Sequence, residues 1–207
     1  MKLGPYNIRA FVLTVQELPQ RTAFIQRHFA ERGIEAEEFN CFSAVESGLK
    51  TVHPYEFDAP GSGWNIGPKG VCMWLSQYML WSAMNVCPDT HFLQLEYDSK
   101  FEPDWRERTE AALRDAPPDF DMLYIGSCCA GDAKHKVQVK GEVWDVRWPL
   151  CSHAIIIAKK ALPTLLRTQR KVYAPIDISL TFHAFGHLKI YTVLPRIADQ
   201  WDTVLKP

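Results

Sequence analysis

The stretch His91-Phe92-Leu93-Gln94-Leu95-Glu96-Tyr97-Asp98 decides how the chain is interpreted, because an apolar run ends there in two closely spaced carboxylates. Ser99-Lys100 and Pro103-Asp104 follow, which predicts that a buried strand stops at Glu96 and that the backbone turns there. A strand end that carries two acids suits a hard divalent cation that keeps open positions for phosphate oxygens. The alternative is a surface turn with two solvated acids.

Length and composition favour a folded enzyme-sized domain over a disordered or fibrous chain. The 207 residues fit one large domain or two small ones, and 47% of them are hydrophobic. The formal net charge of -1 gives no general attraction to nucleic acid or to an anionic membrane, although a local basic patch stays open. We therefore expect a single domain over residues 1–207.

Targeting and cysteine signals favour a cytoplasmic protein. The longest apolar runs, such as residues 154–158, are too short to span a bilayer, and residues 1–7 lack the apolar segment of a secretory signal. The six cysteines contain no Cys-x-x-Cys pair, so we expect most of them to be reduced, buried and structural. The expectation of a reduced, structural role is weakest for Cys128 and Cys129, because they follow a predicted strand end.

Apolar periodicity predicts alternating strands and helices. Strands are expected over residues 10–15, 39–44, 91–96, 121–126, 152–158 and 188–194, and helices over 19–32, 71–81, 105–114 and 159–170, the last interrupted by Pro163. Residues 136–144 alternate around Gly141 as in a hairpin. Glycine and proline recur over 45–69, which predicts a mobile loop, either a lid or a plain insertion. This order indicates an α/β fold with an antiparallel insertion in its later half.

The order of several motifs is similar to that of glycosyltransferase family 25, which includes lipopolysaccharide-type and collagen galactosyltransferases. The matching segments are Phe11-Val12-Leu13-Thr14 with Leu18-Pro19-Gln20-Arg21, residues 39–44, residues 69–77, the acidic strand end 93–98, residues 152–161, Pro175-Ile176-Asp177 and residues 191–195. Several positions differ from the family pattern. Tyr97 replaces the middle acid of its Glu-Asp-Asp motif, and Gln77 stands where it has histidine. Cys72 and Met73 replace its Gly-Cys pair, and Thr14 replaces an Asn-Leu position.

The resemblance implies a single GT-A type, Rossmann-like domain that binds a nucleotide sugar, with a mixed sheet and helices on both faces. It also implies donor contacts from Thr14, Ser76 and Glu96, and a metal bound by Glu96 and Asp98. Arg21 would lie near the end of the first strand and contact the donor phosphate or base, with a solvated helix position as its alternative.

Three further residues are candidates for the acceptor side or the metal. Asp177 is our candidate general base or acceptor-orienting group, and its alternative is a helix N-cap or an ordinary turn acid. His183 and His187 bracket Gly186 and can complete the metal shell or contact phosphate; otherwise they are structural or surface histidines.

Two functions follow from these residues. The first is a glycosyltransferase that uses Mn²⁺ or Mg²⁺ and a nucleoside diphosphate sugar, with UDP favoured, and that inverts the anomeric centre as the resemblance implies. Its acceptor would be a saccharide, a protein or a hydroxymethylated DNA base; nucleic acid is not favoured by the net charge, although residues 134–140 carry several basic side chains. The second is a catalytically inactive GT-A domain that binds a carbohydrate or a partner, which the changes at Tyr97 and Gln77 favour.

Overall fold

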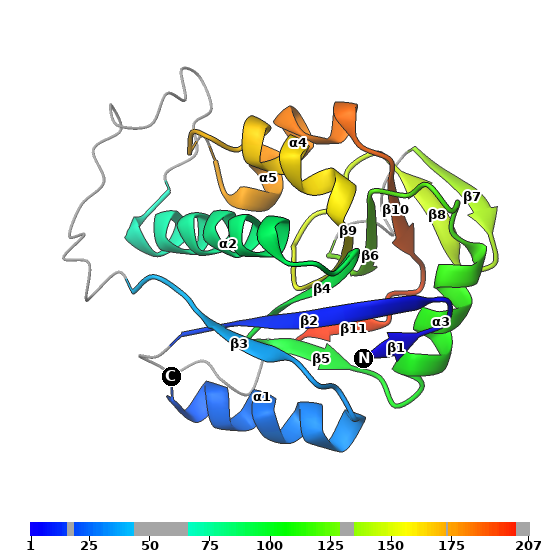
Figure 1. Cartoon of the computed structure of the whole chain (residues 1–207), viewed down its shortest axis with the longest axis horizontal. Coiled ribbons are helices and arrows are strands. Elements are labelled where there is room, and N and C mark those ends of the chain that lie inside the picture. The colour runs from blue at the N-terminus through cyan, green and yellow to red at the C-terminus, as the bar shows by residue number, and fades with distance from the viewer. Residues whose placement is uncertain (16–18, 44–65, 129–134, 173, 202–207) are drawn as a thin grey trace.

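A computed structural model describes residues 1–15, 19–43, 66–128, 135–172 and 174–201 (Figure 1). The strands are β1 (Lys2–Leu3), β2 (Tyr6–Thr14), β3 (Glu37–Asn40), β4 (His91–Glu96), β5 (Ser99–Phe101), β6 (Met122–Gly126), β7 (Lys136–Lys140), β8 (Val143–Val146), β9 (Ala154–Ala158), β10 (Ile190–Val193) and β11 (Ala198–Gln200). The helices are α1 (Pro19–Arg32), α2 (Pro68–Val86), α3 (Trp105–Asp115), α4 (Leu162–Thr168) and α5 (Ile176–His183), with short 3₁₀ turns η2 (Lys159–Ala161) and η3 (Phe185–His187).

Strand directions in the central sheet bring one set of strand ends to a common edge. The sheet has nine strands in the order β1-β2-β4-β9-β6-β10-β8-β7, with β3 also paired to β2, while β11 and β5 form a separate pair. Strands β3 and β4 pair with β2 in parallel, and β10 pairs with β6 in parallel. Strand β9 is antiparallel to both β4 and β6, so β2, β3, β4, β6 and β10 all point the same way. The carboxyl ends of five strands therefore meet at one edge.

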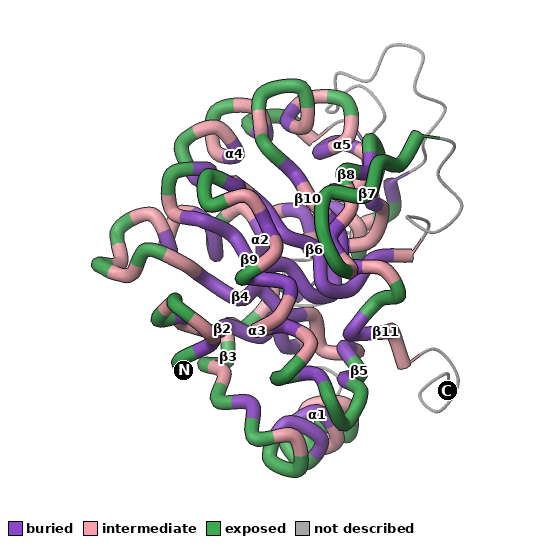
Figure 2. The backbone as a smooth tube through the Cα atoms, turned by 90° about the vertical axis from the view of Figure 1, so that its right-hand side faces the viewer, coloured by how far each residue is buried: buried purple, intermediate pink, exposed green. Residues whose placement is uncertain are grey.

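Alternating side chains divide the core into two layers, one on each face of the sheet. Leu93 and Leu95 of β4 pack in the layer that contains α1 and α3, whereas Phe92 packs in the layer that contains α2, α4 and α5. Buried residues follow the central strands, while β7 is exposed throughout (Figure 2). The predicted α/β fold, with a mixed sheet and helices on both faces, is confirmed.

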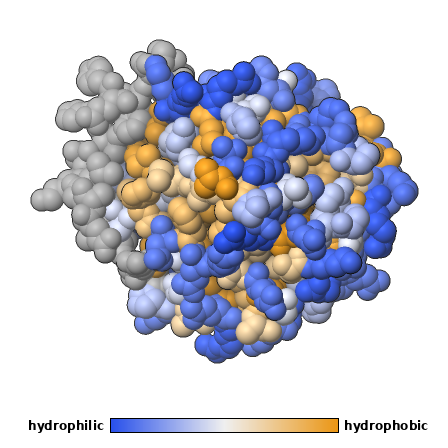
Figure 3. All heavy atoms as spheres, viewed as in Figure 1, coloured by the Kyte–Doolittle hydropathy of each residue, from blue (hydrophilic) through white to orange (hydrophobic). Residues whose placement is uncertain are grey.

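The surface seen in the view of Figure 1 carries both hydrophilic and apolar residues. In Figure 3 hydrophilic residues form most of the rim, and apolar residues gather over the region of α2, which exposes Met79 and Val86. No helix among the described residues is long and apolar enough to cross a membrane.

Most local assignments agree with the structure, and the differences concern one strand boundary, Pro163 and several short elements. The strand expected over 39–44 lies earlier, at β3. Pro163 does not interrupt a helix but occupies the first turn of α4, where proline costs little because that N–H has no helical partner. Helix α5 and the short strands β1, β5 and β11 were not predicted, since each is too short to give a clear periodic signal. The expected mobile loop lies mostly outside the described residues.

Candidate functional site

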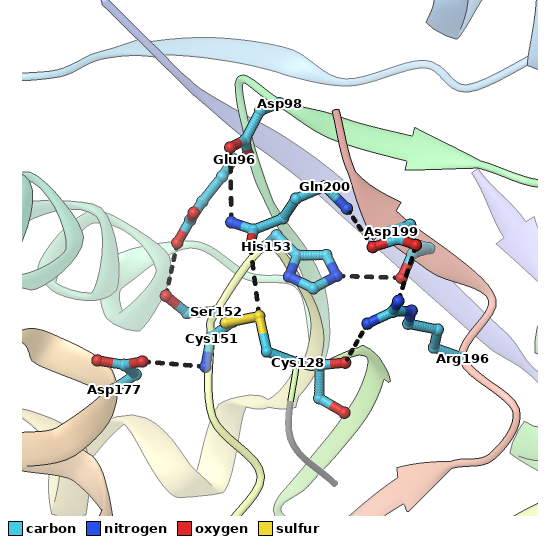
Figure 4. The surroundings of a disulfide bond; sticks show 12 residues. Glu96, Asp98, Cys128, Cys151, Ser152, His153, Asp177, Arg196, Asp199 and Gln200 are labelled. Atoms are coloured by element: carbon cyan, nitrogen blue, oxygen red, sulfur yellow. Dashed lines mark hydrogen bonds and ion pairs between the residues drawn. A yellow bond between two sulfur atoms is a disulfide. The ribbon is translucent and has the colours of Figure 1, made fainter. Parts of the chain in front are cut away.

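The chain turns sharply directly after β4, as the sequence predicted. The hydroxyl of Ser99 lies 2.7 Å from the carbonyl oxygen of Glu96 and 2.5 Å from that of His153, and it accepts a 3.1 Å bond from the Glu96 N–H. These bonds close the turn that carries Tyr97 and Asp98. Strand β11 lies alongside, where Gln200 Nε2 donates to Asp98 Oδ2 over 3.5 Å (Figure 4).

A chain of buried polar side chains holds the Glu96 carboxylate. Ser152 Oγ donates to Glu96 Oε1 over 2.5 Å, and Gln77 Nε2 donates to the same oxygen over 3.2 Å and to Ser152 Oγ over 2.9 Å. Gln77 is held in turn by Gln94 Nε2, and Gln94 Oε1 accepts a 2.7 Å bond from the indole of Trp81. Both of these side-chain donors to Glu96, Ser152 and Gln77, approach the same oxygen, Oε1.

The surroundings of Glu96 favour its protonated form. Burial, the neighbouring Asp98 and the more distant Asp177 raise the pKa of Glu96 to about 7, although bonds from Ser152 and Gln77 oppose the rise. Among the described residues neither Glu96 nor Asp177 forms an ion pair. Three carboxyl groups therefore influence one another at this edge of the sheet, and a divalent cation would relieve their repulsion.

Asp177 lies in the first turn of α5, so it is neither the N-cap of that helix nor an acid of an ordinary turn. Pro175 precedes the helix as its N-cap, because its fixed φ suits a helix start. Asp177 Oδ2 accepts a 3.0 Å bond from the Cys151 N–H, and Oδ1 accepts a 2.9 Å bond from the Ile178 N–H. These two bonds fix the orientation of the carboxylate toward the loop that precedes β9.

Cys128 and Cys151 form a disulfide at this edge, with Cα atoms 5.5 Å apart (Figure 4). The expectation that most cysteines are reduced had set Cys128 apart, and it is wrong for Cys151. The end of β6 and the loop before β9 converge although the two cysteines are 23 residues apart in sequence. Cys41, Cys72 and Cys87 form no disulfide in the part of the chain that the structure describes. Cys129 lies outside the described residues.

The predicted donor residues occupy the same edge of the sheet but differ in what they contact. Thr14 ends β2 and is buried, with its hydroxyl donating to Asn40 Oδ1 over 3.1 Å. Arg21 lies in the first turn of α1 with its guanidinium 5.3 Å from the centre of the Tyr97 ring. Ser76 is fully buried, donates to the Cys72 carbonyl over 2.6 Å and accepts from a backbone N–H at 2.8 Å, so its hydroxyl is engaged within the protein.

The structure separates the two histidines from the acidic turn. His183 lies at the last turn of α5 and His187 in η3, whereas Asp177 is in the first turn of the same helix. Among the described residues, no three of Glu96, Asp98, Asp177, His183 and His187 have ligand atoms within 4.8 Å of one another. The structure thus brings Glu96, Asp98 and Asp177 to one edge but does not add the histidines to a preformed metal shell.

Three positions at this edge were not singled out as site residues by the sequence analysis. Ser152 and Gln200 contact the two acids of the turn; Ser152 begins a segment that matches the family, but its polar contact with Glu96 was not predicted. Tyr124 of β6 is fully buried, and burial with the nearby charges of Asp177 and Glu96 raises its pKa, so its hydroxyl stays protonated. Only strand order could have revealed them, because each belongs to a different segment.

Comparison with known proteins places the chain near one family. A "Glycosyltransferase 25 family member" of Drosophila melanogaster is 29% identical over 128 residues, which cover 57% of this chain and 21% of the relative. A protein of the same description from Drosophila pseudoobscura pseudoobscura is 25% identical over 126 residues, covering 56% of this chain and 20% of the relative. The chain thus spans about a fifth of the length of these curated relatives. No family model matches the chain.

Solved structures give weaker likenesses. A197 from STIV has a TM-score of 0.46 at 12% identity, covering 92% of this chain and 83% of that one. A mutant Drosophila β-1,4-galactosyltransferase 7 in complex with manganese, UDP-Gal and xylobiose has a TM-score of 0.40 at 9% identity, covering 94% of this chain and 68% of that one. These likenesses are too weak to assign a ligand. The sequence relatives carry the assignment, and they confirm the predicted resemblance: over more than half of its length the chain is similar to members of glycosyltransferase family 25.

Proposed function

We propose that the chain is a metal-dependent glycosyltransferase domain that moves a sugar from a nucleoside diphosphate sugar, with UDP favoured, to an acceptor hydroxyl with inversion. The observation that carries the proposal is the acidic turn Glu96-Tyr97-Asp98 at the carboxyl edge of five parallel strands. In open α/β sheets ligands bind outside the carboxyl ends of the strands, which is where this turn lies.

The acidic turn fits a hard cation such as Mn²⁺ or Mg²⁺. Glu96 and Asp98 would supply oxygen ligands; burial first and then the negative charge of Asp98 raise the pKa of Glu96 to about 7, and a bound cation would offset that charge. When bound, such a cation stabilises the charge that develops on the leaving diphosphate. His183, at the end of α5, and His187, in η3, are not needed for this role, because phosphate and water oxygens can complete the coordination shell of the cation.

In the proposed reaction, Gln77 and Ser152 act on the donor side through Glu96, and Asp177 acts on the acceptor side. Gln77 and Ser152 fix Glu96 through one oxygen, so the carboxylate does not reorganise when the donor binds. Asp177, oriented by two backbone N–H groups, would accept the proton of the acceptor hydroxyl as its oxygen attacks the anomeric carbon. The bond from that carbon to the diphosphate oxygen breaks in the same step.

Two of the departures from the family pattern, at Gln77 and Tyr97, have local roles that do not require loss of activity. Gln77 links Gln94 to Glu96 and Ser152, so the amide keeps the carboxylate in place where the family has histidine. Tyr97 lies against the Arg21 guanidinium, which gives the middle position of the motif a cation–π partner in place of an acid. These contacts favour the enzyme over the inactive binding module.

The proposal also extends to the acceptor and to the cellular location of the protein. A saccharide or protein hydroxyl is preferred to a hydroxymethylated DNA base, because the basic hairpin residues Lys136 and Lys140 lie on β7, at the far end of the strand order from β4.

The cytoplasmic location stays a prediction, and the disulfide does not favour it, since such bonds persist mainly in oxidising compartments.

The proposal is tested by donor binding and turnover. UDP with Mn²⁺ should raise the melting temperature, because a ligand that binds only the folded state stabilises it. Release of UDP from UDP-sugars in the presence of Mn²⁺ would then distinguish the enzyme from a binding module, which should show none. Asp98→Ala should abolish the metal-dependent shift, whereas Asp104→Ala, at an exposed acid before α3, should not.

A second variant separates the acceptor side from the donor side. Asp177→Asn keeps the shape of the side chain but cannot accept a proton, so transfer should fall by about 100-fold or more while UDP and Mn²⁺ affinity stay near that of the unmodified protein. Equal loss of donor binding and transfer would instead place Asp177 at the metal. Absence of binding by every nucleoside diphosphate would end the proposal.

A further inference from the structure

The loop before β9 contacts both carboxylates to which the proposed function gives a role. The N–H of Cys151 donates to Asp177 Oδ2 over 3.0 Å, and the hydroxyl of the next residue, Ser152, donates to Glu96 Oε1 over 2.5 Å. Two adjacent residues thus connect the proposed acceptor side with the proposed metal side (Figure 4). Any change in the backbone at Cys151 would move one carboxylate relative to the other.

Cys151 has a backbone conformation that residues with a β-carbon rarely adopt. Its φ is +64°, and among the described residues it is the one non-glycine residue with a positive φ. The left-handed conformation is unfavourable for an L-residue with a β-carbon, so surrounding contacts have to impose it. In this position it directs the Cys151 N–H toward Asp177 and the Ser152 side chain toward Glu96.

Bonds to the end of β6 hold Cys151 in this left-handed conformation. Cys128 joins Cys151 through the disulfide, and the Cys128 N–H donates to the Leu150 carbonyl over 2.9 Å. Cys128 follows Gly126 and Ser127 directly, so it is anchored to a buried central strand of the sheet. The loop is therefore attached at the residue whose conformation is unfavourable and at the residue before it.

We propose that the Cys128–Cys151 disulfide is a positioning element, which holds Cys151 in the left-handed conformation and thereby sets Asp177 relative to Glu96. This inference rests on the proposed function, because it assigns the two carboxylates to opposite sides of one transfer. Breaking the bond should lower kcat more than it raises the KM for the donor, since an error of about 1 Å in alignment can cost about 100-fold in rate.

Three variants separate the bond from the backbone conformation. Cys128→Ala removes the bond and leaves a β-carbon at position 151, and Cys151→Ala does the same from the other side. Cys151→Gly also removes the bond, but glycine adopts a positive φ without cost. Cys87→Ala removes a free cysteine at the end of α2, near the opposite edge of the sheet, and is the matched control.

We expect kcat to fall by about 10- to 100-fold in Cys128→Ala and Cys151→Ala, with the donor KM within about threefold. Cys151→Gly should recover about tenfold of that loss, because the left-handed conformation is no longer penalised. Dithiothreitol, which takes up the bond as its own cyclic disulfide and leaves two protein thiols, should reduce the unmodified protein to the level of Cys128→Ala and leave Cys151→Gly unchanged. All assays run at a temperature at which urea denaturation shows each variant folded.

A measurement without substrate keeps this inference separate from the proposed function. Hydrogen exchange at the Cys151 amide reports its bond to Asp177, and Asp177→Ala gives the exchange rate without that bond. Reduction or Cys128→Ala should move the rate toward this reference, even if the unmodified protein transfers no sugar and the proposed function fails. Unchanged protection at Cys151, or equal kcat in Cys151→Ala, Cys151→Gly and the unmodified protein, would overturn the inference.

Discussion

Replacing Glu96 with glutamine should stabilise the folded protein above pH 7. The pKa of Glu96 rises from its usual 4.5 to about 7, first because of burial and then because of the nearby Asp98. A tenfold change in proton affinity corresponds to about 1.4 kcal/mol, so ionising Glu96 in the folded state costs about 3 kcal/mol more than in the unfolded chain. Glutamine has nearly the same shape, and its oxygen can still accept the bonds from Gln77 and Ser152.

The pH dependence follows from the direction of the shift. Between about pH 4.5 and pH 7 the folded protein holds a proton on Glu96 that the unfolded chain has lost, so this group's contribution to stability falls as the pH rises and is constant above 7. The Glu96→Gln variant does not lose this contribution to stability as the pH rises. Its advantage over the unmodified protein should be below about 1 kcal/mol at pH 5 and about 3 kcal/mol at pH 8.

Urea denaturation at pH 5 and pH 8 in EDTA measures this difference, because the chelator prevents a cation from offsetting the repulsion. Glu35→Gln, at an exposed acid after α1, is the control and should change the free energy of unfolding little at either pH. A Glu96→Gln variant that is no more stable than the unmodified protein at pH 8 would refute the reasoning. It would mean that the site already compensates the charge of Glu96.

Three further predictions concern the packing around the site. Cys128→Ala should lower the free energy of unfolding by about 3 kcal/mol, since the lost cross-link closes a loop of 23 residues; a urea midpoint equal to that of the oxidised protein would contradict this. Gly126→Ala should cost about 1–3 kcal/mol, because a β-carbon there would meet the buried His153 ring and the Ala198 carbonyl oxygen. An unchanged melting temperature would show that both the ring and the β11 backbone can move. Trp81→Phe leaves the buried amide oxygen of Gln94 without its indole donor and should also cost about 1–3 kcal/mol in urea denaturation, whereas a loss under about 0.5 kcal/mol would mean that another donor replaces the indole.

Much of the fold could be predicted from local sequence patterns. The apolar run before Glu96 gives a buried strand, and the spacing of Val71, Trp74 and Trp81 gives α2, because burial on one face repeats at the period of the element. Pro19 and Gly33 bracket α1 for the same kind of local reason. Helix α5 was missed because its eight residues are short and follow a proline that equally suits a turn.

The candidate site could be predicted only in part. The acids of the turn were identified because they interrupt an apolar run, and Asp177 was identified by resemblance. The groups that hold them were not, since Gln77 and Ser152 lie 19 and 56 residues from Glu96, and Cys151 lies 26 residues from Asp177. Nor does the spacing of six cysteines reveal which two are bonded.

The sequence by itself determined the α/β class, most strands and helices, and the acidic end of β4, because these depend on the periodicity and chemistry of neighbouring residues. The tertiary structure decided which polar groups surround that acidic end. The antiparallel strand β9 lies between β4 and β6, and this placement brings Ser152 to Glu96 and Cys151 to Cys128. Strand order depends on packing of the whole sheet and is not encoded in any one segment, so contacts across the site appear only in the folded chain.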